Sequence, residues 1–174
     1  DDCVEILHNT RRSVRYSIGM TTTLQLGNAV PDLTLTDDAG SDVRLHDLAG
    51  KTVVLYFYPK DDTPGCTTQA CSIRDEWSTF DRDDIALFGV SPDSAESHTK
   101  FRTKYDLPFP LLVDADHALA EAFGIWTEKK NYGKTYMGIV RSTVIINPDS
   151  TIRTIKRNVK PADHTTWLAS ELGL

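Results

Sequence analysis

The residues best suited to chemistry are Cys66 and Cys71, which lie five positions apart in the segment YPKDDTPGCTTQAC at residues 58–71. A cysteine thiolate is a nucleophile that can be oxidised and restored, so this segment suits redox or nucleophilic chemistry. The spacing differs from the C-x-x-C of dithiol reductases. Taken alone, an unpaired cysteine is most often a small hydrophobic residue of the core, so its surroundings must decide between packing and catalysis.

A disulfide between these two cysteines conflicts with a regular helix. Two residues five positions apart on an ideal helix have Cα atoms roughly 8–9 Å apart, whereas a disulfide needs less than about 7 Å. If Cys66 and Cys71 bond, the helix between them must unwind. A zinc site normally has about four ligands at short paired spacings, and the five histidines are scattered without such pairs. We therefore expect neither a metal nor an organic cofactor.

A strand before Cys66 and a helix around it must position its thiol. Residues 52–58 are continuously apolar or β-branched, which predicts a strand covered on both faces, and Pro59 ends that strand. Residues 73–80 repeat large apolar side chains at helical spacing. Thr63 and Pro64 suit the N-cap and the first position of this helix.

Cys66 is thus expected in the first turn of a helix, where backbone N–H groups lack intrahelical partners. Those amides and the positive end of the helix dipole stabilise an anion, so the thiol should ionise more readily than in water. A thiol with a pKa of about 8.5 is about 3% ionised at pH 7, so full ionisation accelerates a reaction by at most about 30-fold, or about 2 kcal/mol. Orientation and charge stabilisation must supply the rest.

The remaining patterns predict an α/β protein. Apolar or alternating runs typical of strands occupy residues 33–36, 43–45, 85–90, 111–113, 138–146 and 151–156. Helical patterns, the first capped by Ser91, occupy residues 91–105, 116–123 and 161–172. A β-α-β half followed by a β-β-α half is the order of a thioredoxin-like fold, with a central mixed β-sheet flanked by helices.

Length and composition indicate one globular domain. The 174 residues fit a domain at residues 22–174, while residues 1–21, with Cys3, are expected to be a weakly structured arm, such as a tag or leader remnant. A net charge of -6 argues against nucleic-acid and membrane partners, and no apolar run approaches the roughly 20 residues of a membrane helix. The odd cysteine count and a start unlike a secretory signal favour functional thiols in the reducing cytoplasm.

Two separated motifs resemble one known family. Pro59, Thr63 and Cys66 match the P-x-x-x-T-x-x-C active-site signature of the peroxiredoxins. The string TPGCT at residues 63–67, together with Cys71, is similar to the branch called bacterioferritin comigratory protein, or peroxiredoxin Q. Far along the chain, YGK at 132–134 and MGIVRST at 137–143 resemble the segment that carries the active-site arginine of that branch. The likeness covers roughly residues 24–172.

The resemblance implies a thioredoxin-like, peroxiredoxin fold and the reduction of hydrogen peroxide and organic hydroperoxides by a Cys66 thiolate. Cys71 matches the resolving position, which would form an intrachain disulfide with Cys66 after local unwinding. Thioredoxin or a glutaredoxin would then restore both thiols. The protein is expected to be a monomer or weak dimer.

The residues around Cys66 can each be given a role on physical grounds. Arg141, always charged and able to donate in a fork, suits both orienting a peroxide and stabilising its leaving oxygen, and the Thr63 hydroxyl and the Gly65 and Cys66 amides complete a cradle. Pro59 is expected to shield the thiolate from water. Carboxylates near a thiol raise its pKa, so the adjacent pair at 61–62 is expected to be solvated and to point away.

Three aromatic residues are candidates for an apolar approach to Cys66 for organic peroxides, although aromatic side chains more often only pack: Phe57, Trp126 and Tyr132.

Two other functions use the same thiols. A thiol-disulfide oxidoreductase on this fold is disfavoured by the missing C-x-x-C and by the presence of Thr63 and Arg141. A non-enzymatic redox sensor or holdase would need only stoichiometric oxidation of Cys66 and Cys71, whereas a peroxidase turns over with its reductant.

Overall fold

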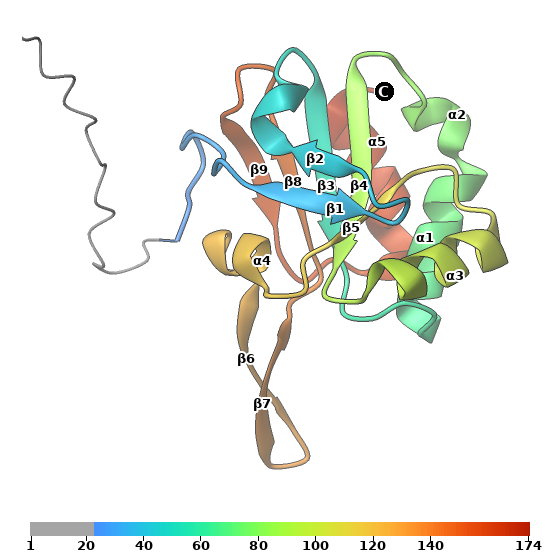
Figure 1. Ribbon diagram of the computed structural model, residues 1–174, viewed down its shortest axis with the longest axis vertical. Helices are drawn as coiled ribbons and strands as arrows, with labels where there is room; N and C mark the ends of the chain where they lie inside the picture. The colour runs from blue at the N-terminus through green and yellow to red at the C-terminus, as the bar shows by residue number, and fades with distance from the viewer. Residues whose placement is uncertain (1–22) are drawn as a thin grey trace, which may run out of the picture.

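The computed structural model describes residues 23–174, and the expectations for residues 1–21, including Cys3, lie outside the described part (Figure 1). A seven-stranded mixed sheet has the order β2-β1-β5-β4-β3-β8-β9. Its strands are β1 (Thr34–Asp37), β2 (Asp42–Arg44), β3 (Thr52–Phe57), β4 (Ile85–Ser91), β5 (Leu111–Val113), β8 (Ser142–Ile146) and β9 (Ile152–Lys156). The predicted thioredoxin-like α/β fold with a central mixed sheet is confirmed.

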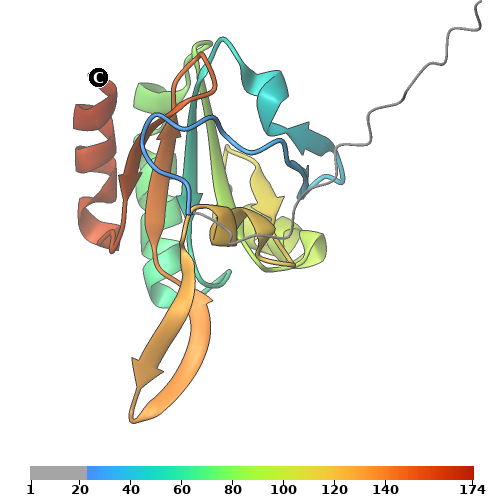
Figure 2. The same ribbon diagram turned by 90° about the vertical axis from the view of Figure 1, so that its left-hand side faces the viewer.

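Helices cover both faces of the sheet. They are α1 (Pro64–Asp75), α2 (Trp77–Phe80), α3 (Ala95–Tyr105), α4 (Ala118–Ala122) and α5 (His164–Leu172), with short 3-10 turns η1 (Leu45–Leu48) and η2 (Pro161–Asp163). Figure 2 shows α5, in red, and α4, in yellow-orange, on opposite sides of the central strands. Between residues 23 and 174 the structure contains no helix that is both long and apolar enough to cross a membrane.

The central strand β3 is buried on both faces, as its apolar run predicts. Because successive side chains of a strand point to opposite faces, Val53, Leu55 and Phe57 join the core beneath α4. Val54 and Tyr56 face the core that contains α1, α3 and α5. Cys66 belongs to this second core, so its thiol lies against the sheet.

Strand pairing decides which loops meet at the end of β3. β4 pairs with β3 in parallel, and β8 pairs with it antiparallel, so that Phe57 lies opposite Ser142. The residue that precedes β8 must therefore lie beside the loop that follows β3. That residue is Arg141.

The prediction of one strand at residues 138–146 is wrong. The run is divided between β7 (Lys134–Ile139) and β8, with Val140 and Arg141 between them. β7 pairs with β6 (Trp126–Asn131), a strand that the sequence patterns did not predict, and this hairpin projects from the main sheet (Figures 1 and 2). β6 is largely polar and half-exposed, so it lacks the apolar alternation that marks a strand facing a core.

Helix boundaries also differ from the predictions. Ser94, not Ser91, caps α3, because its side chain accepts a hydrogen bond from the Ser97 amide at 3.1 Å. The predicted helix at 116–123 shortens to α4, and the one at 161–172 begins with the turn η2. The helix after Cys66 is interrupted at Glu76, which separates α1 from α2.

Candidate active site

The guanidinium of Arg141 lies against the thiol of Cys66. Cys66 is the third residue of α1 and is only 2% exposed. Arg141 Nη2 donates to Cys66 Sγ at 3.3 Å. The glycine before the cysteine permits this approach, since a Cβ on Gly65 would lie 3.2 Å from Arg141 Nη2. Arg141 thus presents a permanent positive charge and a hydrogen-bond donor to the Cys66 sulfur.

Thr63 precedes α1 with an extended backbone, but it does not cap the helix through its side chain. Its hydroxyl donates instead to the Lys60 carbonyl at 2.8 Å, so the predicted side-chain cap is wrong. The Thr63 carbonyl accepts the first helical hydrogen bond, from the Thr67 amide at 2.8 Å. Thr63 therefore closes the loop at residues 60–63 and places the start of the helix.

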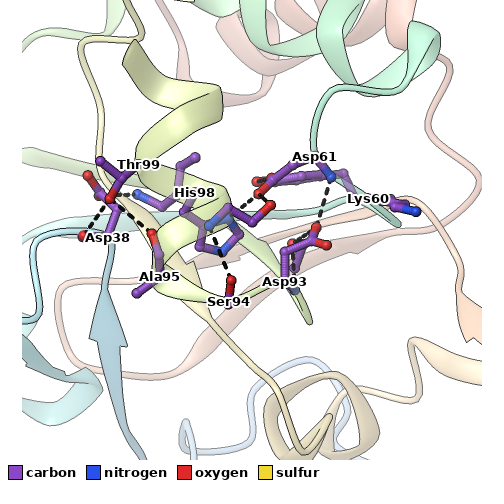
Figure 3. A network of polar contacts seen from close by, with 12 residues as sticks. Asp38, Lys60, Asp61, Asp93, Ser94, Ala95, His98 and Thr99 are labelled. Atoms are coloured by element: carbon purple, nitrogen blue, oxygen red, sulfur yellow. Dashed lines mark hydrogen bonds and ion pairs between the residues drawn. The ribbon is translucent and has the colours of Figure 1, made fainter. Parts of the chain in front are cut away.

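The loop before α1 is anchored by a buried carboxylate. Asp61, 8% exposed, accepts hydrogen bonds from Tyr58 Oη at 2.6 Å and Ser97 Oγ at 2.8 Å. Its Oδ2 also lies 2.7 Å from His98 Nδ1. Figure 3 shows both side chains within this network of polar contacts. The expectation that Asp61 is solvated is wrong, because its side chain turns into the core against α3. Both Asp61 and the exposed Asp62, which binds Lys104 and Tyr105, nonetheless engage α3 rather than Cys66.

His98 is charged in this arrangement. Its Nδ1 faces the Asp61 carboxylate, and its Nε2 lies 2.9 Å from the Leu112 carbonyl. Both partners are acceptors, so both ring nitrogens must carry protons. Burial lowers the pKa of His98, but the hydrogen bond and charge of Asp61 outweigh it and raise the pKa overall.

The cluster of Asp61, Asp93 and His98 offers ligand atoms within 4.8 Å of one another. With both ring nitrogens used as donors, His98 has no lone pair for a metal ion. The cluster is therefore an anchor: Asp93 Oδ2 accepts from the Asp61 amide at 2.8 Å and fixes the same loop from the β4 side (Figure 3).

Two residues that were not predicted from the sequence, Gln69 and His164, are linked to Arg141 by hydrogen bonds. Gln69 Oε1 accepts from Arg141 Nη1 at 2.6 Å, so the guanidinium bridges Gln69 and Cys66. Gln69 Nε2 lies 3.1 Å from Nδ1 of His164, the first residue of α5. Gln69 is three positions after Cys66 and so shares its helix face, a spacing that can be found in the sequence. No sequence pattern points to His164, which lies 95 positions away from Gln69.

A cavity of about 520 Å³ opens beside Pro59. Its lining is mostly apolar and includes Trp126, Met137 and Lys129. Burial, and then the charge of Arg141, lower the pKa of Lys129, while Cys66 opposes that change. Of the aromatic residues expected to line an approach, only Trp126 lies here.

The other two aromatic residues lie elsewhere. Phe57 is fully buried in the core on the α4 side of the sheet. Tyr132 is 99% exposed in the turn of the β6–β7 hairpin. The expectation that they line an approach to Cys66 is therefore wrong, because β3 directs Phe57 to the opposite face and the hairpin carries Tyr132 outward.

Cys71 lies on the same helix as Cys66 and is half-buried. Both are free thiols, and α1 continues through both positions. An unbroken helix keeps two residues at this spacing beyond disulfide range, as the sequence analysis expects. Reduced thiols and an intact helix therefore occur together in this structure.

A thiol in the first helical turn, an arginine fork beside it and a thioredoxin-like sheet define a class of cysteine-dependent redox enzyme. The chain belongs to the AhpC/TSA family, whose model matches residues 26–155.

Individual relatives identify the branch of the family to which the chain belongs. It is 54% identical over 142 residues to Peroxiredoxin Bcp of Bacillus subtilis, covering 82% of this chain and 90% of the relative. It is 40% identical over 141 residues to Peroxiredoxin Bcp of Escherichia coli, covering 81% and 90%. The protein is a peroxiredoxin of the bacterioferritin comigratory protein, or peroxiredoxin Q, branch, and hence a thiol peroxidase.

Solved structures agree with this placement. A structure of Xanthomonas campestris peroxiredoxin Q is 39% identical, with a TM-score of 0.79, covering 88% of this chain and 98% of that one. The bacterioferritin comigratory protein of the same organism, studied for alkyl peroxide reduction, is also 39% identical with a TM-score of 0.79, covering 86% and 96%.

Proposed function

We propose that Cys66 is the peroxidatic cysteine and that Arg141 is its electrophilic partner. The observation that carries the proposal is the 3.3 Å contact from Arg141 Nη2 to Cys66 Sγ at the buried start of α1. The Cys66 thiolate attacks the terminal oxygen of a hydroperoxide, so that an S–O bond forms and the O–O bond breaks. The sulfur is oxidised to sulfenic acid, and the leaving oxygen takes up a proton and departs as water or an alcohol.

The residues around the thiolate supply what ionisation alone cannot. Arg141 stabilises the charge that develops on the leaving oxygen, together with the N–H groups of Gly65 and Cys66 at the first turn of α1. Thr63 places these amides through its bond to the Lys60 carbonyl. Pro59 stands at the edge of the cavity and limits the access of water to the thiolate.

Cys71 resolves the oxidised cysteine. Once α1 unwinds locally, the Cys71 sulfur attacks the sulfenic sulfur, an S–S bond forms, and the hydroxyl group leaves as water. A dithiol reductant, thioredoxin or a glutaredoxin, then reduces the disulfide by two thiol-disulfide exchanges. The enzyme acts as a monomer or weak dimer in a reducing compartment, the cytoplasm.

Hydrogen peroxide and organic hydroperoxides are the proposed substrates. The mostly apolar cavity beside Pro59 suits the organic part of the larger ones. The related Xanthomonas campestris protein has been studied for alkyl peroxide reduction, which supports the same substrate class here.

Peroxide consumption with a thioredoxin system tests the proposal in the wild type and two variants. Cys66→Ser should abolish turnover, because serine cannot form a stable nucleophilic anion at neutral pH. Cys71→Ser should react once with peroxide but lose recycling. Activity that survives in Cys66→Ser would refute the mechanism, and full cycling of Cys71→Ser would remove the resolving role alone.

A further inference from the structure

A buried chain of hydrogen bonds joins the C-terminal helix to the guanidinium beside Cys66. His164 Nε2 lies 2.8 Å from Thr143 Oγ1 on β8, and His164 Nδ1 lies 3.1 Å from Gln69 Nε2 on α1. Gln69 Oε1 accepts from Arg141 Nη1 at 2.6 Å. These hydrogen bonds therefore connect three elements, β8, α5 and α1, to the guanidinium of Arg141.

The donor and acceptor groups of these side chains fix the direction of every hydrogen bond in the network. A guanidinium only donates, so the Gln69 atom that faces Arg141 must be the carbonyl oxygen. The Gln69 amide nitrogen then faces His164 and donates to Nδ1, which cannot carry a proton. His164 is thus the neutral tautomer with its proton on Nε2, where the Thr143 hydroxyl oxygen accepts it.

The surroundings of His164 enforce this neutral form. The side chains of Gln69 and His164 are almost completely inaccessible, at 0% and 1% exposure. Burial, followed by the positive charges of Lys156 and Arg141, lowers the pKa of His164 to about 3. A protonated ring would also point a donor at the Gln69 amide. Gln69 is then held in the single orientation that presents its oxygen to Arg141.

Gln69 also lies between Cys66 and Cys71 on α1. When the helix unwinds to let the two sulfurs meet, the Gln69 side chain must leave its buried place. Its hydrogen bonds to Arg141 and His164 break, and His164 Nδ1 loses its partner. The arrangement that favours attack on peroxide therefore opposes formation of the disulfide.

We propose that His164 is a positioning residue: through the Gln69 amide it holds Arg141 in the orientation that serves Cys66, and the same link restrains the turn of α1 that must unwind for Cys71. This inference rests on the proposed roles of Cys66, Cys71 and Arg141. Removing the hydrogen bond between His164 and Gln69 should slow the reaction of Cys66 with peroxide and accelerate formation of the disulfide with Cys71.

Rapid-mixing measurements of the intrinsic tryptophan fluorescence of the full chain can follow both steps. His164→Phe keeps a planar aromatic ring, somewhat larger than imidazole, but removes the acceptor, and Gln69→Met tests the same link from the other end. Each should lower the second-order rate with hydrogen peroxide roughly 10- to 100-fold, because Arg141 is displaced. Each should raise the rate of disulfide formation about fivefold, because a net hydrogen bond no longer holds the helix. His164→Gln, which retains an acceptor, should recover part of the peroxide rate.

Two matched variants separate positioning from general packing. Asp83→Asn changes an exposed residue just before β4, away from α1, and should leave both rates unchanged. Leu168→Val loosens the buried face of α5 without touching the Gln69 amide.

Opposite changes of the two rates in His164→Phe and Gln69→Met, absent from Leu168→Val, support the inference. Wild-type rates in both variants, or the same changes in Leu168→Val, would overturn this inference but leave the proposed function standing. Peroxide reduction by Cys66→Ser would overturn the proposed function and this inference together.

Discussion

Arg141 Nη2 and Cys66 Sγ lie 3.3 Å apart although the residues are 75 positions apart in the chain. The contact follows from strand pairing, since β8 runs antiparallel to β3 and its first residue, Ser142, lies opposite Phe57 at the last position of β3. The end of β3 leads into the loop and helix that carry Cys66, and the start of β8 follows directly on Arg141. The central pair of strands thus brings the thiol and the guanidinium together.

Replacing Arg141 by lysine should separate charge from geometry. Arg141→Lys keeps the positive charge but loses the fork that contacts Gln69 Oε1 and Cys66 Sγ together. We expect the second-order rate with hydrogen peroxide to fall about 100-fold, because the donor is no longer held in place. Stopped-flow fluorescence measures this rate, with the exposed Arg82→Lys as the control. A loss of less than about threefold would show that charge alone suffices.

The close approach of Arg141 to Gly65 predicts that Gly65→Ala reacts slowly with peroxide but remains stably folded. In Gly65→Ala the new Cβ would lie 3.2 Å from Arg141 Nη2, which pushes the guanidinium aside. Gly65 is the second residue of α1, so alanine gains only part of the roughly 0.5–1 kcal/mol that it gives over glycine in a helix interior, and stability should not fall by much. We expect a peroxide rate at least about tenfold lower with a nearly unchanged urea midpoint. A parallel loss of rate and stability would point to a damaged fold instead.

Two neighbouring tyrosines should respond oppositely to loss of their hydroxyl groups. Within residues 23–174, the buried Tyr56 hydroxyl has no hydrogen-bond partner, so Tyr56→Phe should raise the free energy of unfolding by about 1–3 kcal/mol. Tyr58 Oη donates to the buried Asp61 carboxylate at 2.6 Å, so Tyr58→Phe should lower it by a similar amount. Urea unfolding of both variants checks the pair, and changes of the same sign would contradict this assignment.

The ion pair between His98 and Asp61 should make stability depend on pH. The folded pKa of His98 is raised, so its contribution is complete below the unfolded pKa of about 6.5 and is lost as pH rises through the folded value. Asp61, Asp93 and the Tyr58 ring face His98. Urea unfolding from pH 6.5 to 9 should show a falling free energy of unfolding in the wild type. His164 is neutral in the folded state but about half protonated in the unfolded chain at pH 6.5, so it adds a small opposite slope up to about pH 7.5 and none above it.

His98→Gln is the test of that assignment. The variant should be less stable than the wild type at pH 6.5, and its free energy of unfolding should vary less with pH. An identical pH profile in the wild type and His98→Gln would show that other groups produce the dependence.

Local patterns were sufficient where a segment is uniform and buried. The continuous apolar run of β3, the hairpin of β1 and β2 and the proline-containing turn between β8 and β9 were all predicted close to their observed bounds. The β6–β7 hairpin was missed, because β6 is polar and half-exposed. Its turn residues, Tyr132 and Gly133, both have positive φ angles, and the glycine is the residue type that could have indicated this turn.

Local sequence was enough to predict the backbone setting of Cys66, the proposed nucleophile. The string TPGC after an apolar run places Cys66 in the first turn of a helix, and the five-residue spacing to Cys71 predicts that the helix must open before a disulfide forms. These conclusions depend only on bonds and dihedral angles within a few residues, so local sequence is enough for them.

The surroundings of the thiol depend on how distant segments pack together. The partnership of Arg141 with Gln69, the neutral state of His164 and the burial of Asp61 beside His98 arise where β8, α5 and α3 pack against the loop and helix of Cys66. Aspartate is ordinarily a surface residue, so its burial could not be expected before the partner on α3 was known. The orientation of a buried polar group depends on its partners, and here those partners lie 37 to 95 positions away in the chain.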